Sequence, residues 1–255
     1  MRLIPLYAAM LMVAGCASQA PAPSAPPDIQ DLNHASTEQA PVEQADTAEA
    51  KPTSPLLPSA FFADGAPAFV AWRCTPAQDL IAASPEGELR LWSRQGFYRL
   101  DPAVVASGAR YVKGDLSFWN KGSEAVVESA NGRLECEQDV SRETTTRETR
   151  PNAIFFAKGN EPGWMMILDR QTSHLRLIAD YGQQTLTLPY KIERLANGQE
   201  ATVQLRSTRD DQPLQARLQA KACFDSMSGM PYPVQVTLQW QERTLRGCGQ
   251  GIEGL

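Results

Sequence analysis

The chain has 255 residues, a formal net charge of −5 at pH 7 and two histidines. Nucleic-acid binding normally needs a strongly basic face, so this charge argues against a nucleic-acid partner. The sequence contains no G-x-S-x-G, no H-E-x-x-H and no glycine-rich phosphate loop, which are motifs of common hydrolases and nucleotide-binding enzymes. We therefore expect a binding protein and not an enzyme, with no cofactor and no metal.

The N-terminal segment has the features of an export signal. Arg2 precedes the apolar run LIPLYAAMLMVAG, which is followed by Cys16. This run is too short for a spanning helix and predicts a signal peptide over residues 1–15. The ending VAGC resembles the lipobox of bacterial lipoproteins, whose cysteine carries acyl chains such as palmitate and becomes the mature N-terminus. The alternative is an ordinary signal peptide that discards Cys16. Because Ala17 follows, the resemblance implies an outer-membrane lipid anchor, with the protein facing the periplasm.

Residues 16–60 have the composition of a tether. They are rich in Pro and Ala, contain His34, and have no aromatic residue between 17 and 58. The segment contains six acidic residues and one basic residue, Lys51, so most of the net negative charge of the chain belongs to it. Such a segment cannot bury enough apolar surface to offset its ordering entropy, so we expect it to be disordered.

The remaining cysteines form an even set: Cys74, Cys136, Cys223 and Cys248. In an exported chain such a set predicts two disulfides, with three connectivities open. Pairing sequence neighbours would give each half its own disulfide, which stabilises by roughly 4 and 3.5 kcal/mol from the loops closed. The charged segment EQDVSRETTTRETRPN between the halves then predicts a domain boundary, with domains at 61–140 and 152–255.

Both halves show the pattern of short β-strands. The first half contains FVAWRC, GELRLWSR, GFYRL, ARYVKG, LSFW and EAVVES, separated by Gly, Pro or Asn-Gly. In the second half, apolar and polar residues alternate over 214–222 and 234–240, and His174 lies at the edge of a predicted strand. Asn131-Gly132 and Asn197-Gly198 are hairpin signals. We expect a mainly β protein made of two small antiparallel β domains, either barrels or sandwiches.

The segment SGARYVKGDLSFWNKGSEAVVE, which begins at Ser107 and is followed by GRLEC, resembles the MliC/PliC family of membrane-bound and periplasmic inhibitors of C-type lysozyme. The resemblance covers about residues 68–138, although the stretch 75–106 is not aligned. It implies a small antiparallel β-barrel with a disulfide and a C-type lysozyme as partner. It also implies that the serine of the SGxxY segment and the lysine of the WxKG segment enter the lysozyme cleft; these are Ser107 and Lys121 here.

The chemistry of these residues agrees with that role. Asn120-Lys121-Gly122 is expected to be a three-residue hairpin tip, with Gly122 in the left-handed conformation and the lysine projecting outward. Tyr111 and Gly122 complete the expected lysozyme-binding set, and Tyr111 and Trp119 are expected to pack in the core or at its rim. Without the resemblance, Lys121 would be read as an ordinary polar turn residue.

The second half brings no mechanism. The landmarks GNEPGW (159–164) and DSMSG (225–229) resemble a β domain of bacterial envelope lipoproteins that has no assigned activity. Glu161 and Asp225 are either turn caps or site residues. Copper binding by Met165, Met166, Met227 and Met230 is the weaker hypothesis, because methionine is more often core filler. The alternative function for the protein is an envelope structural or assembly lipoprotein that binds another periplasmic protein or a glycan.

Overall fold

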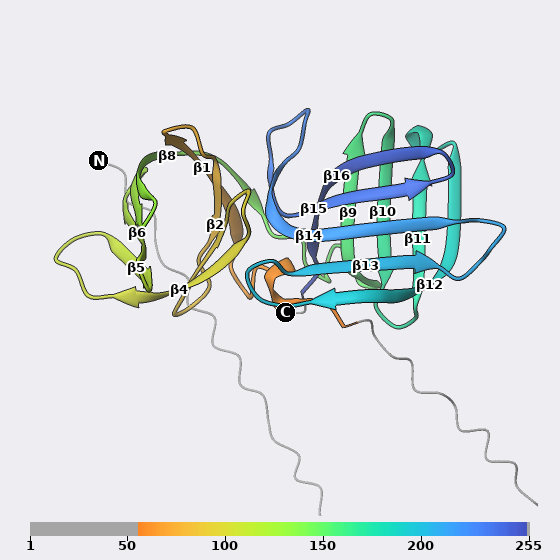
Figure 1. Cartoon of the computed structure of the whole chain (residues 1–255), viewed down its shortest axis with the longest axis horizontal. Coiled ribbons are helices and arrows are strands. Elements are labelled where there is room, and N and C mark those ends of the chain that lie inside the picture. Colours follow the sequence, from red (N-terminus) through yellow and green to blue (C-terminus); the bar gives the residue numbers. More distant parts are fainter. Residues whose placement is uncertain (1–55, 254–255) are drawn as a thin grey trace, which may run out of the picture. The chain divides into compact units, whose positions relative to one another are not determined.

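The computed structural model describes residues 56–253, whose strands form two closed antiparallel barrels (Figure 1). Barrel 1 comprises β1 (Ala68–Thr75), β2 (Leu80–Ala83), β3 (Leu89–Trp92), β4 (Phe97–Ala103), β5 (Ala109–Lys113), β6 (Leu116–Lys121), β7 (Glu124–Ser129) and β8 (Gly132–Glu143). Each strand pairs with the next, and β1 closes the barrel on β8. The prediction of a mainly β protein is confirmed, and the first half is a barrel.

Barrel 2 has the same up-and-down topology. It comprises β9 (Ala153–Asn160), β10 (Gly163–Asp169), β11 (His174–Ala179), β12 (Gln184–Ala196), β13 (Thr202–Ser207), β14 (Leu214–Phe224), β15 (Pro231–Trp240) and β16 (Arg243–Gly251). The barrel closes through β16 and β9, and the short 3-10 helix η2 (Asp180–Gly182) connects β11 to β12. The predicted alternation in β14 is confirmed, since every second residue from Leu214 to Ala222 is buried.

Each barrel holds one disulfide, in the predicted neighbour pairing. Cys74–Cys136 joins β1 to β8 and so fastens the closing seam of barrel 1. Cys223–Cys248 joins β14 to β16 in barrel 2. The loops they close contain 62 and 25 residues, and the longer loop removes more entropy from the unfolded chain.

The pairing can be checked on the protein in solution. Non-reducing peptide mapping should yield only the Cys74–Cys136 and Cys223–Cys248 cross-linked peptides, because each pair is already adjacent within its own barrel. A Cys74–Cys223 peptide would contradict the separate closure of the two barrels.

Strand β2 differs from an ordinary barrel strand because all four of its residues are buried. Leu80 and Ala82 belong to the core of barrel 1, whereas Ile81 and Ala83 belong to a larger core that also contains the interior of barrel 2. A strand shows period-2 alternation only where one of its faces meets water. This is why residues 80–83, which the sequence patterns did not identify as a strand, read only as an apolar run.

The packed part of the chain begins slightly before the expected end of the tether. Ser59–Phe61 form the 3-10 helix η1, in which Ala60 and Phe61 are buried. At the other expected boundary, β8 continues to Glu143, past residue 140.

The signal peptide, Cys16 and the tether up to residue 55 lie outside the described residues. Among the residues described, none of the helices has the length and apolar character needed to cross a membrane.

Both Asn-Gly pairs lie at hairpins, as predicted. Between β7 and β8 the two connecting residues are Ala130 and Asn131, and Gly132 already pairs with Ser129 as the first residue of β8. Between β12 and β13 the connection is longer, over residues 197–201, with Gly198 at φ +87°.

Candidate functional site

Ser107 and Lys121, which the resemblance singles out, lie close to one another on barrel 1. Ser107 belongs to the loop 104–108 between β4 and β5, and Lys121 is the last residue of β6. The β5–β6 register pairs Ala109 with Asn120, which sets the end of this loop beside the end of β6. Both side chains are exposed. The fold therefore presents the two residues at the same end of the barrel.

Trp119 connects them. Its indole Nε1 donates a hydrogen bond to the Ser107 carbonyl oxygen at 3.0 Å, and the Lys121 ammonium lies 3.7 Å from its ring centroid. Residues two apart on a strand share a face, so the tryptophan and the lysine extend from β6 together. Trp119 is half-buried, as expected for a rim residue. Its contact with the Ser107 loop was not anticipated.

Gly108 allows the loop to approach β6 this closely. A Cβ atom at this position would lie 2.2 Å from the Asn120 carbonyl oxygen and 3.1 Å from Cγ of Lys121. The residue also has φ +73°, a conformation that favours glycine. The glycine after Ser107 in the SGxxY segment is thus required by geometry on two counts.

The hairpin tip is one residue further along than predicted. Lys121 pairs with Glu124, so the connection consists of Gly122 and Ser123, and the three-residue Asn120-Lys121-Gly122 tip is wrong. The left-handed conformation expected for Gly122 is present, with φ +71°. A positive φ at the first central residue alone is the pattern of a type II′ turn, whose twist suits a two-residue hairpin. Lys121 is therefore held by strand pairing, directly before the turn.

Tyr111 has a different environment. It pairs in register with Phe118, which is buried in barrel 1, and packs half-buried against the same core. Side chains alternate across a strand, so Tyr111 lies on the opposite face of the sheet from Arg110 and Trp119. Of the four predicted lysozyme-binding residues, the structure brings together Ser107, Lys121 and Gly122, and places Tyr111 behind them as packing.

The surface around the pair carries an arginine that is paired with Glu128 and an exposed apolar residue. Arg110 lies 5.9 Å from the Trp119 ring, while among the described residues Lys121 makes no salt bridge and is free to meet an incoming carboxylate. Val104, at the start of the Ser107 loop, is 104% exposed. Large apolar residues this exposed are rare on the described surface and can mark a contact site.

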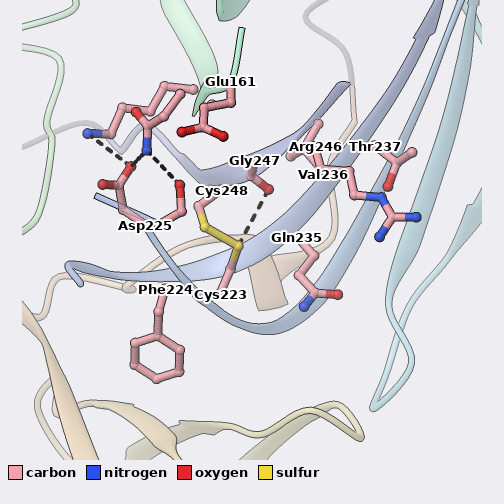
Figure 2. A pocket seen from close by; sticks show the side chains of 14 residues that line it. Glu161, Cys223, Phe224, Asp225, Gln235, Val236, Thr237, Arg246, Gly247 and Cys248 are labelled. Carbon is pink, nitrogen blue, oxygen red and sulfur yellow. Dashed lines mark hydrogen bonds and ion pairs between the residues drawn. A yellow bond between two sulfur atoms is a disulfide. The ribbon is translucent and has the colours of Figure 1, made fainter. Parts of the chain in front are cut away.

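Barrel 2 has a pocket of about 350 Å³ that is lined by the ends of β9 and β14 and by the middle of β15 and β16 (Figure 2). Asp225 is buried at its edge and receives hydrogen bonds from the Ser228 backbone N–H at 2.8 Å and hydroxyl at 2.6 Å. Asn160 Nδ2 donates to its second oxygen at 3.1 Å, and the Lys158 ammonium lies 3.4 Å away. Asp225 is therefore a cap of its own turn, one of the two roles considered for it. Glu161 is exposed at the pocket rim.

These contacts change the protonation of Asp225. Burial alone would raise the pKa of this carboxyl, but the hydrogen bonds from Ser228 and Asn160 and the charge of Lys158 outweigh burial and hold the pKa well below its usual value. A lowered folded-state pKa means that the ionised carboxylate stabilises the fold above the unfolded pKa and that this contribution is lost as the pH falls.

We accordingly expect Asp225→Asn to lower the free energy of unfolding by about 1–3 kcal/mol at pH 7, because charge-assisted hydrogen bonds are lost. The difference from wild type should shrink below about pH 4, the range of an unfolded aspartate. Urea unfolding at pH 7 and pH 3 measures both values. Asp211→Asn, at a pair whose two side chains are exposed, is the matched control and should have a much smaller effect. An equal loss at both pH values would contradict the role of the charge.

The four methionines do not form a common site. Met166 is fully buried in the main core, and Met165 and Met230 pack against two other clusters. Met227 is 79% exposed. A soft-metal site needs its thioethers to converge, so this arrangement supports packing roles for the three inner methionines.

The fold and the Ser107–Lys121 pair define barrel 1 as a small disulfide-closed barrel that presents a hydroxyl and an ammonium at one end. Residues 72–135, which span both side chains, match the family of the membrane-bound lysozyme-inhibitor of c-type lysozyme, MliC. The match confirms the resemblance for barrel 1; it covers about a quarter of the chain, and barrel 2 lies outside it. Comparison with curated proteins gave no match.

Proposed function

We propose that this protein inhibits C-type lysozyme by inserting Ser107 and Lys121 into the catalytic cleft. The cleft of such an enzyme holds two carboxyl groups, one kept protonated by an apolar pocket and one ionised. The Lys121 ammonium pairs with the ionised carboxylate and disfavours protonation of its neighbour, because a nearby positive charge lowers a carboxyl pKa. The Ser107 hydroxyl completes the hydrogen-bond network, as it can donate and accept.

One observation carries this proposal. The segment that matches the inhibitor family contains both Ser107 and Lys121, and the fold sets both at one exposed end of barrel 1. The end has a shape suited to a cleft, because it consists of a two-residue hairpin and an adjacent loop. No carboxylate of the described residues forms an ion pair with Lys121. Binding of an external carboxylate therefore breaks no existing ion pair.

The location proposed for the protein follows from the N-terminal residues. Acylation of Cys16 would hold it at the outer membrane, facing the periplasm, where a lysozyme that crosses the outer membrane would meet it. Several acyl chains on one cysteine exceed the two signals needed for stable anchoring. Cys16→Ser should therefore move the protein from the membrane fraction to the soluble fraction; a variant that stays in the membrane fraction would contradict the anchor.

The direct test is a lysis assay with the soluble chain from residue 17 onward. Turbidity loss of peptidoglycan-containing cells in the presence of a C-type lysozyme should be suppressed at micromolar or lower inhibitor. A G-type lysozyme, whose catalytic site differs, is the parallel control. Undiminished lysis by the C-type enzyme at micromolar protein would favour the second candidate function.

That candidate is an envelope structural or assembly role, in which the protein binds another periplasmic protein or a glycan. It is favoured by barrel 2, where Tyr181 and Met227 are 76% and 79% exposed. Both lie near Asn160: the Tyr181 hydroxyl donates to its carbonyl oxygen at 3.3 Å, and its amide donates to Ser226, the neighbour of Met227, at 3.0 Å. The two roles are compatible, since each uses a different barrel.

The tether is expected to supply reach and no binding contact. Shuffling residues 20–55 while keeping their composition should leave the inhibition constant of the soluble protein unchanged, because the role proposed for this segment depends on its length and composition and not on the order of its residues. Inhibition assays at low and high salt provide the measurement. A large loss of potency on shuffling would show that the order of residues in the tether matters to lysozyme binding.

A further inference from the structure

The outer face of β6 offers an explanation of how the inhibitory pair is held before lysozyme arrives. A lysine side chain is a flexible four-carbon stem, and a loop such as 104–108 has its own conformational freedom. Ordering both during association would weaken binding, because immobilisation of side chains and loops subtracts from the interaction free energy. A group that contacts both in the free protein removes this loss.

Trp119 is that group in the described structure. Its Nε1–H donates a hydrogen bond to the Ser107 carbonyl oxygen at 3.0 Å, and the Lys121 ammonium makes a cation–π contact 3.7 Å from its ring centroid. A cation on an aromatic face keeps its opposite side open, so Lys121 stays available to a carboxylate. Gly108 keeps the loop against Asn120 on the same side. One indole thus contacts the backbone of the first residue and the charge of the second.

We infer that Trp119 is a positioning residue, which pre-organises Ser107 through its N–H and Lys121 through its ring. The inference rests on the proposed function and deepens it, because it names how the two cleft-binding groups are kept in one arrangement. Arg110, 5.9 Å from the same ring, is held by Ser117, to whose hydroxyl its Nε donates at 3.0 Å, and is not part of the pair.

Two substitutions separate the two contacts. Trp119→Phe keeps an aromatic face under Lys121 and removes the N–H bond to the Ser107 carbonyl; inhibition should weaken about 3- to 10-fold, the range of a lost neutral hydrogen bond. Trp119→Leu also removes the ring and should weaken inhibition by a further factor of roughly 2–5, the range of an exposed cation–π contact.

Double-mutant cycles distinguish positioning from simple packing. The loss caused by Trp119→Phe should nearly vanish in a Ser107→Ala background, since no hydroxyl remains to be placed, and should persist in a Lys121→Ala background. The additional loss of Trp119→Leu should vanish with Lys121→Ala. A purely structural tryptophan would give additive losses in both cycles, and that outcome would overturn the inference.

The matched control is Trp164→Phe in barrel 2. Its Nε1 also donates to a backbone carbonyl, that of Arg246, at 3.2 Å, so the same chemical change is made away from the pair. This variant should alter the melting temperature and leave the inhibition constant within about twofold of wild type. Inhibition by Trp164→Phe as weak as that of Trp119→Phe would overturn the positioning role, because loss of any indole N–H would then suffice.

A measurement on the free protein separates this inference from the proposed function. Protons on the Lys121 side chain above an indole are shifted upfield in the NMR spectrum, and the shift should be kept in part by Trp119→Phe and lost in Trp119→Leu. An unshifted Lys121 signal in the wild type would overturn the positioning role even if the protein inhibits lysozyme. A shifted signal in a protein that does not inhibit would overturn the proposed function and leave the contact between Trp119 and Lys121 established.

Discussion

Lys121→Ala should weaken inhibition of a C-type lysozyme by about 2–5 kcal/mol, because it removes one partner of a charge pair that is desolvated in the complex and leaves the other buried alone. This corresponds to an increase in the inhibition constant of between about 30-fold and several thousand-fold. Ser107→Ala should cost less, about 1–2 kcal/mol, since it removes a hydrogen bond without formal charge. The double variant should lose less than the sum of both.

Lys113→Ala is the control for this comparison. Lys113 is exposed and faces the start of β6 through its register pair with Leu116, whereas Lys121 is the last residue of that strand. The same loss of one surface charge should therefore leave inhibition nearly unchanged. Melting temperatures of all variants must match the wild type, because Gly122 and Trp119 lie next to the substituted residue. Wild-type inhibition by Lys121→Ala would identify the lysine as an ordinary polar residue beside a turn.

Alternation of apolar and polar residues marks a strand in the sequence only where one face of the strand is solvated. The alternation in β14 was readable because its polar residues meet water. Strand β2 has no solvated face and was missed by the sequence patterns. Strand β3 is buried on both faces as well, with Leu91 in barrel 1 and Trp92 in the larger core, yet it lies within the predicted strand GELRLWSR. The second face of each strand packs against a distant part of the chain, with β2 in contact with β15 and β3 in contact with β14, which no local pattern encodes.

The candidate site shows a similar division. Trp119 ends the predicted strand LSFW, but Lys121 was expected in the hairpin tip, so the strand face that they share in β6 was not predicted. The contact of Ser107 with that face depends on the conformation of an irregular loop and on the close approach at Gly108, so only the family resemblance could pair Ser107 with Lys121. The exact residues of the hairpin tip required the strand register, which the sequence leaves open by one residue.

The boundary at the start of the packed chain was predicted closely, but its contact with Arg90 was not. This side chain is only 2% exposed, yet it carries a full charge on β3. Its Nε donates to Glu88 at 2.7 Å, and its Nη1 donates to the carbonyl oxygens of Ser59 and Phe62 at 2.9 and 3.1 Å. The guanidinium therefore fastens the segment around η1, which leads in from the N-terminus, to barrel 1.

Arg90→Met should lower the free energy of unfolding by about 3–5 kcal/mol, because it removes the buried partner of Glu88 and Asp64 and leaves the carbonyl oxygens of Ser59 and Phe62 without this donor. Arg90→Lys should recover little of this, since an ammonium cannot reproduce the fork of the guanidinium. Denaturant unfolding at pH 7 gives the values. The segment around η1 should also become sensitive to proteolysis in the Met variant, ahead of global unfolding.

Arg99→Ala provides the matched comparison, because Arg99 donates to the same Glu88 carboxylate at 2.9 Å but is 56% exposed. An exposed partner in the same ion network should contribute less than about 1 kcal/mol.

The hydrogen bonds from both arginines hold the pKa of Glu88 below its usual value although burial opposes this. Their stabilisation is therefore present above the unfolded pKa, about 4.3, and is lost as the pH falls. The penalty of Arg90→Met should accordingly be smaller at pH 3 than at pH 7. A penalty no larger than that of Arg99→Ala would contradict the role given to Arg90, because the buried guanidinium would then contribute no more than the exposed one.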